Sequence, residues 1–131
     1  MGKDKSENEA PARQILVADD DPAILRLVKA IVEKEGYEAV SARDGKEAYQ
    51  CLQSDAKFAA AIFDVVMPYI QGTELVRYMQ SEKRLMNIPV IMMTGEQNPK
   101  FSSDSFSAGA VAFLPKPFTT SQLKTMLKMF I

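Results

Sequence analysis

From residue 14 onward, short apolar runs alternate with longer amphipathic stretches, and this alternation is the strongest constraint on the fold. It is typical of consecutive βαβ units, in which each helix carries the chain back to start the next parallel strand. The expected strands lie at residues 14–18, 37–41, 58–63, 88–93 and 111–114. The sequence therefore predicts an α/β protein with a doubly wound, five-stranded parallel sheet and five helices.

Helix start and stop signals agree with this alternation. Asp21 and Pro22 have the side chains favoured at a helix N-cap and at the first helical position, and Gly36 is a suitable C-terminal stop. Asp44, followed three residues later by Glu47, resembles a capping box that opens the next helix. These signals place helices between successive strands, as a parallel sheet requires.

Composition limits the function classes. The 131 residues are enough for one domain with a buried core, expected over residues 13–131 behind a flexible polar tail at residues 1–12. The net charge of -1 gives no field that would attract nucleic acid or an anionic membrane, and no apolar run approaches the ~18 residues of a membrane span. The absence of histidine excludes Ser-His and Cys-His nucleophile pairs and histidine-ligated zinc. A single cysteine excludes an intrachain disulfide, and we expect a cytoplasmic protein.

Polar side chains stand at the ends of four expected strands. Asp19 and Asp20 follow the first strand. Asp64 follows the third strand, Thr94 the fourth and Lys116 the fifth. Ligands of doubly wound sheets bind at the carboxyl ends of the strands, beside the switch in strand order. Three acids, a hydroxyl and an amine at that edge suit the binding of a divalent cation and the acceptance of a phosphoryl group.

The three carboxylates carry the metal prediction. If the first and third strands are neighbours, Asp19, Asp20 and Asp64 converge, and like charges this close raise one another's pKa. Mg²⁺ would relieve that repulsion because it is a hard cation that takes oxygen ligands, and Mn²⁺ could substitute for it. Lys116 can pair with Asp64 or with an incoming phosphoryl oxygen, and Thr94 can donate to a second oxygen.

Each of these residues also has a simpler interpretation. Asp21 is better explained as a helix cap than as a metal ligand. Asp19 and Asp20 form an acidic turn before a helix, which favours the helix dipole without any metal. Taken alone, Thr94 is a strand-end hydroxyl and Lys116 a solvated charge. The joint occurrence of these residues at successive strand ends is what indicates a site.

Four stretches of the sequence, taken together, resemble the receiver domain of two-component response regulators over residues 13–131. They are residues 15–22 (ILVADDDP), residues 64–68 (DVVMP) followed by Gly72, residues 92–95 (MMTG) and residues 108–118 (AGAVAFLPKPF). Each stretch is a weak signal alone, but their order and separations make the set specific. The resemblance implies a flavodoxin-like fold with strand order 2-1-3-4-5.

The resemblance also implies a role for each acid. Asp64 would be the phosphoacceptor, which takes a phosphoryl group from a phosphohistidine on a histidine kinase or a histidine phosphotransfer protein. Asp20, Asp64 and the backbone carbonyl of Val66 would bind Mg²⁺ directly, and Asp19 would act mainly through water. Phosphoryl transfer of this kind needs positioning and charge neutralisation more than covalent catalysis.

A second group of residues would respond to the phosphoryl group. By the same resemblance, Thr94 and Lys116 would hold its oxygens, and the Lys116–Pro117 peptide bond would be cis. Phe113 stands at the position of the family's switch aromatic. It would turn inward as Thr94 moves, and so reshape a face that binds a downstream protein target or effector domain.

Val66 and Glu96 flank the path of the hydrolytic water in the family, so they are expected to tune the lifetime of the phosphoryl group. Valine cannot orient a water molecule, which favours slow self-dephosphorylation. Gly95 replaces a more usual alanine and should ease access to the phosphoryl group. Apart from self-phosphorylation and slow self-dephosphorylation, no enzyme activity is expected.

Three other functions fit the sequence less well. An aspartyl phosphatase of the haloacid dehalogenase type carries a second aspartate two residues after its nucleophile, where this chain has Val66. Nucleotide binding is opposed by the lack of a glycine-rich phosphate loop. The remaining alternative is a phosphorylation-independent pseudo-receiver that only binds proteins, and the intact set of polar residues argues against it. Both a stand-alone receiver and a receiver that is part of a longer regulator or hybrid kinase fit the sequence.

Overall fold

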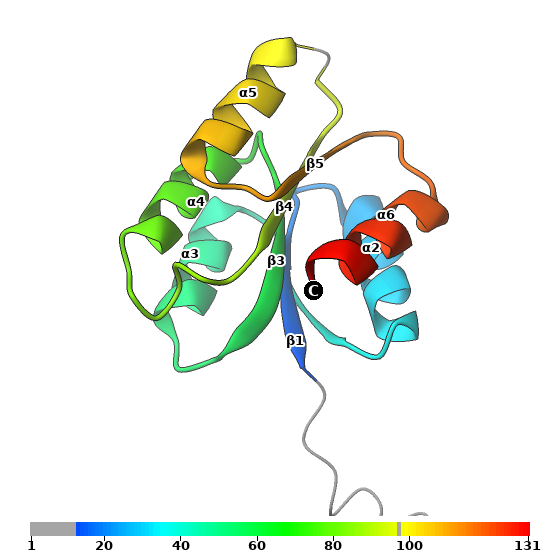
Figure 1. Ribbon diagram of the computed structural model, residues 1–131, viewed down its shortest axis with the longest axis horizontal. Coiled ribbons are helices and arrows are strands. Elements are labelled where there is room, and N and C mark those ends of the chain that lie inside the picture. Colours follow the sequence, from blue (N-terminus) through cyan, green and yellow to red (C-terminus); the bar gives the residue numbers. More distant parts are fainter. Residues whose placement is uncertain (1–12, 97) are drawn as a thin grey trace, which may run out of the picture.

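The computed structural model describes residues 13–96 and 98–131, so the expected tail at residues 1–12 lies outside the described residues. Within them, five parallel strands form one sheet in the order β2-β1-β3-β4-β5, and the predicted fold class and strand order are confirmed (Figure 1). The strands are β1 (Gln14–Ala18), β2 (Glu38–Ala42), β3 (Phe58–Asp64), β4 (Val90–Thr94) and β5 (Ala112–Pro115).

The start of β4 differs from the expected start at residue 88. Proline has no N–H to donate to a strand ladder, so Pro89 stands just outside the strand, and its carbonyl accepts the N–H of Ala61 at 3.0 Å. The ladder then begins at Val90, which lies opposite Ala61 in β3. The strands β2 and β5 also begin one residue later than expected.

Five helices cover the two faces of the sheet within the described residues. They are α2 (Pro22–Lys34), α3 (Gly45–Gln53), α4 (Gly72–Gln80), α5 (Pro99–Ala108) and α6 (Thr120–Phe130). Helices α2 and α6 lie on one face, while α3, α4 and α5 lie on the other (Figure 1). No helix among the described residues combines the length and the apolar character needed to span a bilayer.

Alternation along the strands divides the core between these two layers. Ile15 and Val17 of β1 face the cluster packed against α2 and α6, whereas Leu16 and Ala18 face the cluster packed against α3, α4 and α5. All four side chains are fully buried. A strand covered on both faces is apolar at almost every position, which explains why the central strands β1, β3 and β4 read as near-continuous apolar runs, whereas the edge strand β2 carries the exposed residues Glu38 and Ser41.

The helix boundaries follow the local signals, with one difference. The Asp21 side chain accepts the N–H of Ala23, Pro22 begins α2, and Gly36 follows its end with φ +94°. Asp44 likewise accepts the N–H of Glu47 at 2.8 Å.

The second half of the expected capping box is different. The Glu47 carboxylate accepts the backbone N–H of Arg43 at 2.8 Å instead of that of Asp44. It also pairs with the Arg43 guanidinium at 3.0 Å. The Glu47 carboxylate therefore bonds to the residue before the N-cap, where the ion pair with the Arg43 side chain also holds it.

Candidate functional site

The three predicted acids meet at the carboxyl edge of the sheet. Strands β1 and β3 are adjacent and parallel, and Ala18 lies opposite Phe63, so the residues that follow them are level. One carboxylate oxygen from each of Asp19, Asp20 and Asp64 lies within 4.8 Å of the other two. Asp19 is fully buried and Asp64 is 6% exposed, whereas Asp20 is exposed. The cluster therefore opens to solvent on the Asp20 side.

Lys116 is the counter-charge of this cluster. Its backbone N–H donates to the Thr94 carbonyl at 2.8 Å, which fixes the residue beside the end of β4. Its Nζ lies 2.7 Å from Asp19 Oδ2 and 3.5 Å from Asp64 Oδ2. The expected pairing with Asp64 is present, but Asp19 is the closer partner. The Lys116–Pro117 bond is cis, as expected.

Asp19 uses both of its carboxylate oxygens within the protein. Oδ2 accepts from Lys116, and Oδ1 accepts the backbone N–H of Asp21 at 2.8 Å. Each of these contacts satisfies a lone pair of a carboxylate that is fully buried. Asp20 and Asp64 have no comparable set of protein donors among the described contacts, so their oxygens are the more available for a cation.

Burial and charge change the acidity of two groups in the site. Burial raises the pKa of Asp64 to about 6, with the Asp19 carboxylate adding to the rise and Lys116 opposing it. Burial alone would lower the pKa of Lys116, but its hydrogen bond to Asp19 and the charges of Asp64 and Asp19 outweigh that effect, and the pKa is raised. A divalent cation would remove much of the repulsion that acts on Asp64.

Thr94 is next to Met93, the residue of β4 that lies opposite Asp64 in β3. Thr94 ends β4 and is 2% exposed, and its Oγ1 accepts the backbone N–H of Glu96 at 3.2 Å. A Cβ on Gly95 would lie 3.9 Å from the Lys116 side chain, which is an ordinary contact. In the hydrogen bond from Glu96 the Thr94 oxygen is the acceptor, so the bond does not use the hydroxyl proton.

The loop between β3 and α4 borders the acceptor. Val66 is 40% exposed, as a residue beside an open site should be. A Cβ on Gly72 would lie 2.4 Å from the Asp64 carbonyl oxygen, so only glycine fits there without a shift of the backbone. Tyr69 has φ +72°, a left-handed conformation that is uncommon for residues other than glycine and that a tyrosine side chain does not predict. Sequence reasoning missed this residue.

Phe113 lies apart from the carboxylates, in β5. Its ring is half-buried against the core cluster beneath α3, α4 and α5. Two exposed apolar side chains belong to the same part of the fold: Phe106 of α5 is 51% exposed, and Val111, just before β5, is 39% exposed. Exposed apolar side chains are therefore present on α5, which packs against β5, and just before β5 itself.

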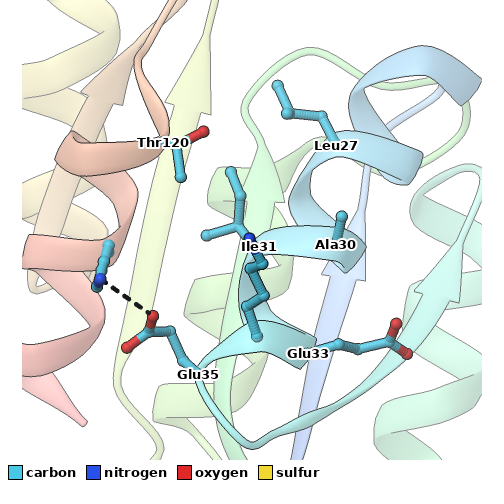
Figure 2. A pocket seen from close by; sticks show the side chains of 8 residues that line it. Leu27, Ala30, Ile31, Glu33, Glu35 and Thr120 are labelled. Carbon is cyan, nitrogen blue, oxygen red and sulfur yellow. Dashed lines mark ion pairs between the residues drawn. The ribbon is translucent and has the colours of Figure 1, made fainter.

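The groove between α2 and α6 is a separate concave region. Its lining includes Leu27, Ile31 and Thr120 (Figure 2). Lys124 and Glu35, which also line it, form an ion pair with 3.8 Å between Nζ and Oε2. None of the polar residues at the strand ends lines it. The candidate site is the carboxylate cluster, not this groove.

The fold and the site define a doubly wound α/β protein with an acidic cluster at the carboxyl edge of its sheet. Residues 15–128 match the family model described as "Response regulator receiver domain". The chain therefore belongs to the response regulator receiver domain family. Members of this family are signalling modules of two-component systems rather than conventional enzymes, and they take phosphoryl groups from histidine kinases.

Individual relatives agree with this assignment. The chain is 34% identical to the chemotaxis protein CheY1 of Helicobacter pylori, over 90% of this chain and 96% of that protein. It is 35% identical to part of the CAI-1 autoinducer sensor kinase/phosphatase CqsS of Vibrio cholerae, over 86% of this chain and 16% of that protein. The solved structure of the Vibrio cholerae chemotaxis protein CheY4 superposes with a TM-score of 0.84 at 30% identity, covering 92% and 100% of the two chains.

The donor set fits the cation that this family binds. Receiver domains bind Mg²⁺ at an acidic pocket. The cluster here offers carboxylate oxygens and no sulfur or imidazole ligand, which is the donor chemistry that Mg²⁺ prefers. The opening on the Asp20 side leaves room for water and phosphate oxygens, which usually complete the coordination of this ion.

Proposed function

We propose that this protein is a phosphoacceptor receiver that takes a phosphoryl group onto Asp64 in a Mg²⁺-dependent reaction and then presents a changed face to a protein partner. The observation that carries the proposal is the position of the Asp64 carboxylate. It lies at the end of β3, close to two further acids, with the Lys116 ammonium 3.5 Å away. The phosphodonor would be a histidine kinase or a histidine phosphotransfer protein.

In the transfer step, a carboxylate oxygen of Asp64 forms a bond to phosphorus while the bond from phosphorus to the donor's histidine nitrogen breaks. The bonding electron pair stays on that nitrogen. Bound Mg²⁺ would neutralise charge on the phosphoryl oxygens. Asp20, Asp64 and the carbonyl of Val66 would hold the ion, and Asp19 would act through water, since its own oxygens already accept from protein donors.

Lys116 and Thr94 would hold the transferred group. The Lys116 ammonium is near Asp64 already, and its raised pKa keeps it charged throughout the neutral range. The Thr94 hydroxyl can turn its proton toward a phosphoryl oxygen while its oxygen continues to accept from Glu96. Both residues would donate to a group that carries negative charge, and such hydrogen bonds are the strong ones.

The response would reach the surface through Phe113. Its half-buried ring can turn inward when Thr94 is drawn toward the phosphoryl group, and the exposed residues Phe106 and Val111 lie in the same part of the fold. A phosphoryl group needs only to favour one of two existing arrangements, and a few kcal/mol are enough for that shift. The face around Phe113 would then bind a downstream protein or effector domain.

Replacement of Val66 by asparagine is expected to shorten the lifetime of the phosphoryl group about fivefold. An amide at this position can orient the hydrolytic water, and one added hydrogen bond is worth about 1 kcal/mol. Loss of the phosphoryl adduct with time, followed by intact-mass spectrometry, measures the lifetime. Leu27→Asn is a matched control, because Leu27 is 40% exposed, as Val66 is, but lies in the groove between α2 and α6, which none of the site residues lines. Equal lifetimes in all three proteins would exclude Val66 as a tuning residue.

Intact-mass spectrometry after incubation with acetyl phosphate tests the proposed function directly. With Mg²⁺ we expect one phosphoryl adduct, which is absent in Asp64→Asn and in the presence of a chelator, and which Mn²⁺ also supports. Folded wild-type protein that gains no adduct under these conditions would overturn the phosphoacceptor assignment. The pseudo-receiver, which binds proteins without phosphorylation, would then be the better description.

A further inference from the structure

Among the described glycines, Gly45, the first residue of α3, leaves the least room for a side chain, and the atoms that it approaches belong to the loop that follows the acceptor. A Cβ on Gly45 would lie 1.8 Å from the carbonyl oxygen of Ile70, 2.6 Å from its carbonyl carbon and 2.8 Å from its Cβ. Two of these three atoms belong to the backbone, which cannot turn aside as the end of a side chain can. Gly45 is itself buried. The N-terminus of α3 therefore rests directly on the loop between β3 and α4.

Hydrogen bonds hold the same loop on both sides of Val66. The carbonyl of Val65 accepts the N–H of Gly72 at 2.9 Å. The carbonyl of Pro68 accepts the N–H of Gly45 at 3.3 Å. Val66 thus lies between two anchored carbonyls, one held by α4 and the other by Gly45.

The backbone between these anchors and α4 is strained. The N–H of Ile70 also donates to the carbonyl of Pro68, at 2.9 Å, which closes a γ-turn around Tyr69. With φ +72°, Tyr69 adopts the less favourable form of this turn. A strained turn persists only where its surroundings hold it, and the contact of Ile70 with Gly45 is part of what holds it.

We propose that Gly45 is a positioning residue for the metal site: its missing side chain and its N–H set the loop so that the Val66 carbonyl points at the cation. This inference rests on the proposed function, in which that carbonyl is a ligand. Mg²⁺ demands near-ideal octahedral geometry with short oxygen distances, so a small displacement of one ligand weakens binding. Groups that orient metal ligands typically change metal affinity 10–100-fold when they are altered.

The test compares Gly45→Ala with Gly36→Ala by titration calorimetry of Mg²⁺. In Gly45→Ala the Ile70 carbonyl must move by about 1 Å or more to clear the new methyl group, and we expect the Kd for Mg²⁺ to rise about tenfold. Gly36 is the matched control. Alanine there is strained by the φ of +94° but meets nothing within 4 Å, so Gly36→Ala should lower stability and leave the Kd unchanged.

The free energy of unfolding of each variant is measured by urea unfolding with a chelator present, and the change in the Kd for Mg²⁺ is compared with the change in stability. If folded Gly45→Ala binds Mg²⁺ with the wild-type Kd, the proposal is wrong. It is also wrong if Gly36→Ala weakens Mg²⁺ binding as much as Gly45→Ala does, because lost stability alone would then explain the change.

A measurement on the wild-type protein decides the matter if Gly45→Ala does not fold. We expect saturating Mg²⁺ to shift the amide resonance of Gly45 in ¹H–¹⁵N spectra and to leave that of Gly36 unmoved. A Gly45 resonance that does not respond to bound Mg²⁺ would overturn the inference. The acetyl phosphate experiment separates the two proposals, because a wild-type adduct on Asp64 upholds the proposed function whatever Gly45 does. Wild-type protein that binds no Mg²⁺ would overturn both.

Discussion

Lys116→Met is expected to lower the free energy of unfolding by about 2–4 kcal/mol at pH 7 with a chelator present. The Lys116 ammonium lies 2.7 Å from a carboxylate of Asp19 that is fully buried, and its own side chain is only 16% exposed. Methionine preserves most of the apolar stem but leaves Asp19 without its counter-charge beside two other acids. Removal of one partner from a buried ion pair lowers stability by more than the intact pair contributes, because the remaining charge is buried without a counter-charge or hydration by water.

The pH dependence of this effect follows from the sign of the shift. The pKa of Lys116 is raised in the folded protein, so the stabilisation is complete below the usual lysine value of 10.5 and is lost only as the pH rises through the folded value. The loss in Lys116→Met should therefore be fully present at pH 7. Saturating Mg²⁺ should reduce it, because the cation takes over part of the charge neutralisation.

Lys124→Met is the matched control for this experiment. Lys124 pairs with Glu35 at 3.8 Å on the surface, where its side chain is 47% exposed. Exposed pairs of this kind contribute little, so we expect a change of about 0.5 kcal/mol or less. Urea unfolding followed by circular dichroism measures both variants. Equal losses for the two substitutions would contradict a specific role of Lys116 in holding the carboxylate cluster together.

Asp64→Asn should have the opposite effect on stability. Burial and the charge of Asp19 raise the pKa of Asp64 to about 6 from an ordinary value of 3.8. The folded protein therefore resists ionisation of this group, and its ionised form at neutral pH destabilises the fold. With allowance for screening by solvent and by Lys116, we expect asparagine to raise the free energy of unfolding by about 1–2 kcal/mol at pH 7 with a chelator present.

The pH profile distinguishes this cause from a general effect of the substitution. A group whose folded pKa is raised contributes stability below its unfolded pKa, and that contribution is lost as the pH rises through the folded pKa. Wild-type protein and Asp64→Asn should therefore be about equally stable near the unfolded value of 3.8, and they should diverge up to and beyond a pH of about 6. Urea unfolding at several pH values in this range measures the difference.

Two further conditions sharpen the prediction for Asp64. Mg²⁺ should reduce or reverse the advantage of Asp64→Asn, because an amide is a poorer ligand than a carboxylate for a hard cation. Asp55→Asn, at an exposed acid after α3, should change stability little at any pH. A variant Asp64→Asn that is less stable than wild-type protein at pH 7 without Mg²⁺ would show that the cluster does not repel as the geometry indicates.

The opposite signs of these two predictions describe how the site is built. Replacement of Asp64 removes one negative charge and relieves the repulsion between the carboxylates. Replacement of Lys116 removes the positive charge that offsets this repulsion. The three carboxylates still carry excess negative charge, so the cluster favours the binding of a divalent cation. The bound cation would in turn offset the negative charge that the oxygens of a phosphoryl group bring to the edge of the sheet.

Much of the fold and most of the candidate site were predictable because their signals are local. The strand positions follow from apolar runs, and the cap of α2 at Asp21 follows from a side chain that bonds two residues away. The shift of β4 to begin at Val90 has a local cause too, since the missing N–H of Pro89 can be recognised without a structure. The placement of Asp64 and Thr94 at one edge follows once the strands are parallel.

The sequence by itself determined which residues end the strands and therefore which chemistry the edge of the sheet can hold. Only the tertiary structure decided that Lys116 lies nearer to Asp19 than to Asp64, and that Gly45 supports the loop after the acceptor. The physical reason is range. Hydrophobic periodicity and helix caps depend on residues a few positions apart. The contacts of Lys116 and Gly45 join segments far apart in the chain, so they depend on how the elements pack and on the burial and charge at the edge of the sheet.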